Sequence, residues 1–131
     1  MIVVDKADLI GSLRDAKGPG WNSVRLLVAA DGTGFSMTET KVEPGTVLDL
    51  HYKHHIEACF CLSGTATVTD LETGREHQIT SGMLYALDMH DPHRVEVTSA
   101  EPWHLICVFS PALRGDEVHG ADGSYASGAS G

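Results

Sequence analysis

The sequence predicts an all-β domain in which two sheets form a sandwich or a barrel. Fourteen glycines and five prolines divide the chain into short runs rich in Val, Thr, Ile and Leu. Turn-forming pairs such as Asp31-Gly32, Pro44-Gly45 and Ser63-Gly64 lie between these runs. Runs of roughly 4–8 residues at a spacing of about 8–12 are typical of an all-β sandwich or barrel.

Partial alternation of apolar and polar residues supports strands rather than helices. Ala66 and Val68 alternate with Thr65, Thr67 and Thr69, as expected for a strand with one buried face. In chain order, the expected strands are Val24–Ala30, Phe35–Val42, Thr46–Tyr52, Glu57–Leu62, Ala66–Leu71, Glu76–Ile79, Met83–Leu87, Arg94–Val97 and His104–Phe109.

One segment near the amino terminus has helical spacing instead. In Asp5–Ala16, Leu9, Ile10 and Leu13 recur at intervals that fit one helix face, with the first residue of the segment or Asp8 as the N-cap. The sequence therefore predicts a short N-terminal helix ahead of the strands.

The length of 131 residues indicates a single domain that closes its own core. We expect this domain to span residues 1–120. Residues 121–131 are rich in Gly, Ser and Ala and are expected to form a flexible tail.

Composition excludes several classes of function. Nine basic against eighteen acidic residues give a net charge of −9, with no basic run, so nucleic-acid binding is not expected. No apolar stretch reaches the roughly 20 residues that span a bilayer, and the start lacks the features of a secretory signal, so we expect no membrane association and a cytoplasmic location. Cys59, Cys61 and Cys107 are expected to be free thiols in a reducing compartment, buried as small hydrophobes.

Two glycine-bounded segments carry the most specific signal. They read Gly45-(five)-His51-Tyr52-Lys53-(three)-Glu57-(six)-Gly64 and Gly82-(five)-Asp88-Met89-His90-(two)-His93. Their spacing resembles the two motifs of the cupin superfamily, whose fold is a double-stranded β-barrel or jelly roll. The resemblance implies one metal held by residues of both segments. The chain departs from the superfamily pattern at Lys53, because a charged ammonium is a poor ligand where a histidine is usual.

Further strings resemble the ectoine synthase family of cupin-type cyclases across residues 1 to about 125. The strings are Trp21-Asn-Ser23-Val-Arg25, Gly34-Phe35-Ser36, Tyr52-Lys-His-His55-Ile-Glu57-Ala58, Gly82-Met-Leu-Tyr85-Ala-Leu-Asp88-Met-His90-Asp-Pro-His93, Cys107-Val-Phe109-Ser-Pro111 and Gly115-Asp-Glu117-Val-His119. The chain differs from the family pattern at Met37-Thr38-Glu39 and at Ala126.

The resemblance implies an iron site made of Glu57, Tyr85 and His93, with Fe(II) as cofactor. One carboxylate, one phenol and one imidazole form a donor set that suits this ion and leaves positions open. The cupin spacing alone favours His51 as a rival ligand. Composition alone would place Tyr85 in an apolar core.

The same resemblance implies further roles around a small-molecule substrate. Glu117 and His119 are candidate lid or proton-transfer residues, and Tyr52 is a further catalytic candidate; we expect residues 114–125 to be flexible and to fold over the barrel mouth only when substrate is present. The substrate-binding candidates are Trp21, Ser23, Arg25, Thr38, Thr40, Tyr52, Cys107 and Phe109. Packing alone is the alternative for Trp21, whereas Arg25 is suited to grip a carboxylate.

The function implied is that of a lyase. The resemblance implies iron-dependent cyclisation of N-γ-acetyl-L-2,4-diaminobutyrate to ectoine with loss of water, in compatible-solute synthesis under osmotic stress. The alternatives are another metal-dependent cupin enzyme, a dioxygenase or isomerase, and a cupin that binds a small ligand without catalysis. The β-branched run Met1-Ile-Val-Val4 has the character of an edge strand, which favours a homodimer.

Overall fold

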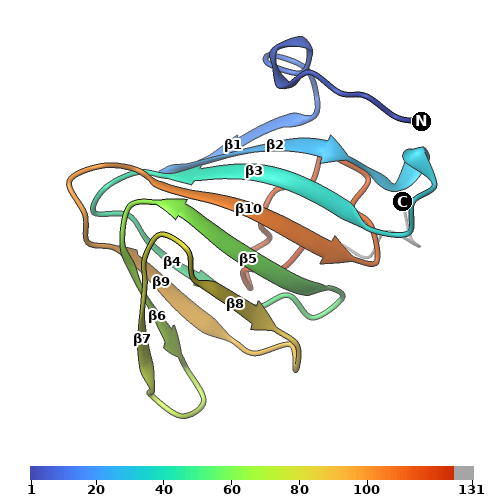
Figure 1. Ribbon diagram of the computed structural model, residues 1–131. Helices are drawn as coiled ribbons and strands as arrows, with labels where there is room; N and C mark the ends of the chain where they lie inside the picture. Colours follow the sequence, from blue (N-terminus) through green and yellow to red (C-terminus); the bar gives the residue numbers. More distant parts are fainter. Residues whose placement is uncertain (126–131) are drawn as a thin grey trace.

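In the computed structural model, which describes residues 1–125, ten strands form two antiparallel sheets that face each other (Figure 1). The larger sheet has six strands in the order β1-β2-β3-β10-β5-β8, and the smaller has four in the order β4-β9-β6-β7. The strands are β1 Asp15–Gly18, β2 Trp21–Leu27, β3 Ser36–Val42, β4 Val47–Leu50, β5 Ile56–Ser63, β6 Ala66–Asp70, β7 Glu76–Ile79, β8 Leu84–Leu87, β9 His93–Val97 and β10 Trp103–Ser110. The expected all-β double-sheet architecture is confirmed.

The amino-terminal segment is less helical than its spacing predicts. Only a 3₁₀ turn, η1 (Lys6–Asp8), forms, and the side chain of Asp5 caps it by accepting from the Ala7 amide. Leu13 stays exposed, so a helix here would have no core to cover. The end of the expected helix forms β1, where Ala16 pairs with Ser23 at the edge of the larger sheet. A short isolated helix is marginal in water, and strand pairing wins. A second 3₁₀ turn, η2, spans Ala29–Asp31.

Strict alternation along two central strands sets which side chains enter the barrel. In β5, Glu57, Cys59 and Cys61 are buried, while their neighbours are exposed or half-buried. In β10, every second residue is buried, including Cys107 and Phe109. The sequence therefore directs one carboxylate and several thiols into the space between the sheets.

The chain after β10 crosses back over the barrel instead of leaving it. Leu113 is fully buried, and its carbonyl accepts from the Ala29 amide at 2.7 Å. The carbonyl of Gly123 accepts from the His51 amide at 3.0 Å, and a side chain at position 123 would clash with the Asp49 carbonyl. Tyr125 is buried against the barrel, so ordered packing continues beyond residue 120. The rest of the expected flexible tail, residues 126–131, lies outside the described residues.

The three cysteines are free and buried, as the sequence predicts. No helix in residues 1–125 is long and apolar enough to cross a membrane.

Candidate active site

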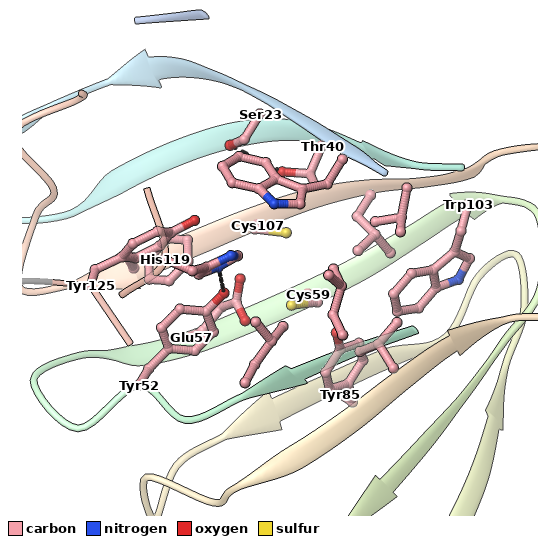
Figure 2. A pocket seen from close by; sticks show the side chains of 17 residues that line it. Ser23, Thr40, Tyr52, Glu57, Cys59, Tyr85, Trp103, Cys107, His119 and Tyr125 are labelled. Atoms are coloured by element: carbon pink, nitrogen blue, oxygen red, sulfur yellow. Dashed lines mark hydrogen bonds between the residues drawn. The ribbon is translucent and has the colours of Figure 1, made fainter. Parts of the chain in front are cut away.

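A cavity of about 460 Å³, counted to its open mouth, lies between the two sheets (Figure 2). Its aromatic lining residues are Trp21, Tyr52, Tyr85, Trp103, Phe109 and Tyr125, and its polar ones are Ser23, Thr40, Glu57, Cys59, Cys107 and His119. The cavity is thus apolar and aromatic, with a few polar groups that converge on it.

Glu57 is the acidic residue of this cavity. Its side chain enters from β5 and is 6 % exposed. Burial raises the pKa of Glu57 to about 7, although the neighbouring thiols of Cys59 and Cys107 partly oppose this shift. Burying a carboxylate without a cation beside it costs free energy, so this position favours a cation that is supplied by a ligand or a metal.

His93 is held so that one ring nitrogen is free. Its Nδ1 lies 2.9 Å from the carbonyl oxygen of Asp91 and donates to it, which leaves Nε2 unprotonated in the neutral ring. Burial lowers the pKa of His93, and this favours the neutral form. Within residues 1–125, the buried Nε2 atom has no hydrogen-bond partner. A backbone carbonyl on one nitrogen and a free second nitrogen are typical of a metal-binding histidine.

Tyr85 and Tyr52 flank the His93 ring. The ring centroids of Tyr85 and His93 are 6.4 Å apart, and those of Tyr52 and His93 are 6.1 Å apart. Tyr85 stacks on Trp103 at 6.0 Å, which fixes its ring plane. Burial raises the pKa of Tyr85, so the phenol keeps its proton unless a cation displaces it. His93 itself borders a second hollow, which it shares with Tyr85.

This donor set fits a ferrous ion. Glu57 offers a buried carboxylate, His93 an orphaned imidazole nitrogen and Tyr85 a phenol beside that ring. Nitrogen and oxygen ligands of this kind suit Fe(II). The rival His51 is half-buried, and its side chain does not line the cavity.

Tyr52, His119 and Tyr125 form an aromatic group at the cavity (Figure 2). The Tyr52 hydroxyl lies 2.8 Å from Nε2 of His119. The His119 and Tyr125 rings are stacked 4.7 Å apart, and Trp21 lies 4.9 Å from His119. Burial, with a contribution from the positive charge of Arg25, lowers the pKa of His119 to about 4. The imidazole is therefore neutral at pH 7.

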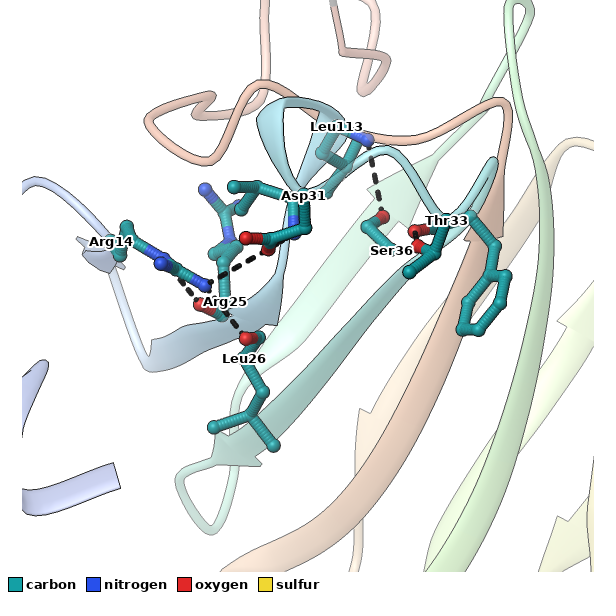
Figure 3. Close-up of polar contacts among 9 residues, drawn as sticks. Arg14, Arg25, Leu26, Asp31, Thr33, Ser36 and Leu113 are labelled. Carbon is teal, nitrogen blue, oxygen red and sulfur yellow. Dashed lines mark hydrogen bonds and ion pairs between the residues drawn. The ribbon is translucent and has the colours of Figure 1, made fainter. Parts of the chain in front are cut away.

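Arg25 lies behind the cavity rather than in its lining. Its guanidinium is fully buried and donates to Ser23 Oγ at 3.1 Å, to the Gly115 carbonyl at 3.2 Å and to the Tyr125 hydroxyl at 3.2 Å. No carboxylate in the described residues forms an ion pair with it. Its backbone carbonyl accepts from Arg14 (Figure 3). The resemblance implied that Arg25 binds substrate directly. Its side chain does not line the cavity, so its positive charge acts on the cavity from behind the wall.

Hydroxyl groups on β2 and β3 form a short chain beside Arg25. Thr38 is fully buried, and its Oγ1 lies 3.2 Å from that of Thr40, which in turn donates to Ser23 Oγ at 3.3 Å. Ser23 and Thr40 line the cavity, whereas Thr38 does not.

Glu117 holds the segment that carries His119. Its carboxylate accepts from the backbone amides of Arg114 and Gly115, each at 2.8 Å. It is buried and does not line the cavity, so it closes a local turn.

Three features of the site escaped the sequence reasoning. Trp103 stacks on Tyr85, and no motif marks it. His55 is fully buried, and neither of its ring nitrogens has a partner in the described residues. Cys59 lies in the cavity wall; its place two residues after Glu57 on one strand face was the available signal.

The barrel and its central cavity define the class of protein. A Cupin 2 conserved barrel domain protein from Salinispora arenicola superposes with a TM-score of 0.63 at 20 % identity, covering 84 % of this chain and 87 % of that one. At this identity, the match shows the fold alone, which is the cupin barrel that the motif spacing predicts.

Closer relatives identify the family. The family model described as ectoine synthase matches residues 1–129. An L-ectoine synthase from Hyphomonas neptunium is 46 % identical over 125 residues, which cover 95 % of this chain and 93 % of the relative. The structure of ectoine synthase from P. lautus superposes with a TM-score of 0.82 at 36 % identity, covering 88 % and 81 %. The chain belongs to the ectoine synthase family, and the prediction that it is an enzyme of the lyase class is confirmed.

Proposed function

We propose that the chain cyclises N-γ-acetyl-L-2,4-diaminobutyrate to ectoine with loss of water, and that it requires Fe(II). The observation that carries this proposal is the unpartnered, buried Nε2 of His93 beside Tyr85, which in turn lines the same cavity as Glu57. Membership of the ectoine synthase family supports the proposed reaction, and the donor set of Glu57, Tyr85 and His93 supports the proposed requirement for a metal.

Glu57, Tyr85 and His93 are the residues that would hold the ion. When bound, the ferrous ion polarises a carbonyl oxygen as a Lewis acid, which helps because an acetamide carbonyl is a poor electrophile. Glu57 brings negative charge to the site, and the Asp91 carbonyl keeps the His93 ring in the required tautomer.

The Tyr52–His119 pair is our candidate for proton transfer. The substrate amine must be neutral to form the new C–N bond, and the carbonyl oxygen leaves as water with two protons from nitrogen. Burial raises the pKa of Tyr52 and lowers that of His119, so the phenol keeps its proton, the imidazole is neutral, and one hydrogen bond of 2.8 Å joins them. Because both side chains line the cavity, a proton can be exchanged there.

The cavity walls orient the substrate. Holding amine and carbonyl at near-attack distance is worth up to roughly 7–11 kcal/mol in well-oriented intramolecular reactions. The aromatic rings of Trp21 and Phe109 with the Cys107 thiol supply shape, and the hydroxyls of Ser23 and Thr40 supply hydrogen bonds.

Arg25 and Thr38 act from behind that wall. Burial is the main cause of the lowered pKa of His119 and of the raised pKa of Tyr125; the positive charge of Arg25 adds to the first shift and opposes the second, so its field reaches the cavity. A substrate carboxylate bound there would be stabilised by this buried charge. Thr38 supports the hydroxyl of Thr40, and Glu117 supports the segment of His119.

We further propose that the working form is a homodimer in the cytoplasm, serving compatible-solute synthesis under osmotic stress. Met1, Ile2 and Val3 are exposed, although the edge strand expected there does not form in the structure. Met83 and Leu84 at β8, the last strand of the larger sheet, are exposed as well. An exposed apolar strand at a sheet edge favours pairing with another chain.

Turnover by the purified protein tests the proposed reaction. Fe(II)-loaded protein is incubated without oxygen with N-γ-acetyl-L-2,4-diaminobutyrate, and products are separated by chromatography. We expect ectoine to form as substrate disappears, and a His93→Ala variant to form little. Unchanged substrate with fully loaded, folded protein would contradict the proposal.

A further inference from the structure

A row of three side chains crosses the larger sheet inside the barrel. Cys107 on β10 lies directly opposite Cys59 on β5, which lies directly opposite Tyr85 on β8. Directly opposite residues in neighbouring antiparallel strands point to the same face of the sheet. Glu57 precedes Cys59 by two residues and shares that face. Two thiols and one carboxylate are thereby brought to one place.

The three donor groups lie at a spacing that one metal ion can close. A carboxylate oxygen of Glu57 and the Sγ atoms of Cys59 and Cys107 are all within 4.8 Å of one another. With Zn–S bonds of about 2.3 Å and Zn–O bonds of about 2.0–2.2 Å, a tetrahedral ion separates its ligand atoms by roughly 3.5–3.8 Å. Small side-chain rotations would bring the three donor atoms from their present separations to these shorter ones.

We propose that Glu57, Cys59 and Cys107 form a binding site for a thiophilic divalent cation, Zn(II) in particular. Thiolate ligands favour Zn(II), whereas the iron set contains only oxygen and nitrogen donors. Each thiol loses its proton to solvent when the metal–sulfur bond forms, so two protons are released per ion bound. The cavity at this point leaves the fourth position open to water.

Both thiols are buried: Cys59 is 1 % exposed and Cys107 is 2 % exposed. Burial raises the pKa of the Cys59 thiol, so a metal must displace its proton in order to bind. Cys61, the next inward residue of β5, differs: its thiol donates to the carbonyl oxygens of Ser63 at 3.4 Å and Gly64 at 3.7 Å. Cys61 is therefore a matched control, a buried thiol on the same strand that is bound to backbone.

The site has one consequence for the proposed reaction. Glu57 belongs to both donor sets, so bound Zn(II) removes a ligand from the iron set. This consequence rests on the proposed function, whereas the thiol site does not.

Co(II) is the probe, because thiolate ligation produces a sulfur-to-metal charge-transfer band. The metal-free, reduced full-length chain is titrated with Co(II) without oxygen. We expect a band that saturates at one equivalent and disappears on addition of Zn(II). Cys59→Ser and Cys107→Ser should each lose most of the band, whereas Cys61→Ser should keep it. No band in the unmodified chain, or an undiminished band in Cys59→Ser, would overturn the proposal.

Two further measurements cover ambiguous outcomes. His93→Ala should keep the band even where it abolishes iron binding, and loss of the band in folded His93→Ala would contradict the assigned ligands. If the serine variants fail to fold, X-ray absorption of the unmodified chain with one equivalent of Zn(II) decides. Two sulfur neighbours at about 2.3 Å are expected, and a shell of only nitrogen and oxygen would refute the site.

Discussion

A single backbone contact determines the chemistry of His93. Because Nδ1 donates to the Asp91 carbonyl, the lone pair of the buried Nε2 has no competing partner within residues 1–125. The motif spacing predicted His93 and Glu57 as ligands, but it also allowed His51. The three-dimensional arrangement favours His93 over His51, because His51 is only half-buried, whereas Nε2 of His93 is buried and has no partner in the described residues.

Iron content therefore distinguishes the two ligand sets. Loss of an outer-shell partner typically costs 10–100-fold in metal affinity, so Glu57→Ala or His93→Ala should cost at least about 100-fold. His51→Ala, the matched control, should retain nearly all bound iron. Metal analysis after equilibrium dialysis provides the measurement. An empty site in His51→Ala together with a full site in Tyr85→Phe would support the ordinary cupin set instead.

His119 links folding to pH. Burial lowers its pKa from 6.5 to about 4, so between these values the unfolded chain binds more protons than the folded one. Stability from this residue is present above pH 6.5 and is lost as the pH falls towards 4, by about 3 kcal/mol at most. His119→Gln should flatten urea-unfolding stability measured across this window. An unchanged pH dependence would show that the ring titrates normally.

At the scale of elements, strand positions were more predictable than the segments at either end. Alternation marks β5 and β10 because each buries one face. The segment Asp5–Ala16 misled because its apolar spacing fits a helix, but Leu13 remains exposed and Ala16 joins a sheet edge. Pairing with a distant strand is information that local periodicity does not contain.

The packing of the segment after β10 was not predicted from the sequence, for the same reason. Its composition indicates a flexible lid, yet Leu113, Glu117 and Tyr125 are buried in contacts with residues distant in sequence. Arg25 alone donates to the Gly115 carbonyl and to the Tyr125 hydroxyl. This segment is a structural wall of the cavity as well as a source of His119.

Truncation after Pro111 should therefore destabilise the fold as well as abolish turnover. It removes the fully buried Leu113 and leaves two donors of the buried Arg25 guanidinium without acceptors. Leu113→Ala alone should cost roughly 2–5 kcal/mol, by analogy with other buried leucines. Deletion of residues 126–131, which are only Ala, Ser and Gly, is the control and should not change the melting temperature. A truncation after Pro111 that melts like the full chain would contradict this role.

For the whole molecule, exposed apolar residues lie on β8, one edge strand of the larger sheet, and in the amino-terminal segment ahead of β1, the other edge strand. Leu84 is 61 % exposed on β8, and Val3 is 86 % exposed near the amino terminus. Light scattering should give twice the chain mass of 14.0 kDa at micromolar concentration. Val3→Asp should shift the mass towards the monomer, while Leu71→Asp, at an exposed turn, should not. A monomer mass for the unmodified chain would rule out the dimer.

We propose that one metal ion, held by Glu57, Tyr85 and His93, lies where the new C–N bond of ectoine is formed. Anomalous diffraction at the iron edge, from crystals prepared with Fe(II) and substrate without oxygen, locates this ion. We expect one peak within bonding distance of the Glu57 carboxylate, the Tyr85 phenol and Nε2 of His93, with substrate or ectoine density beside it. A peak coordinated by His51, or no peak in crystals of active protein, would rule out this metal site.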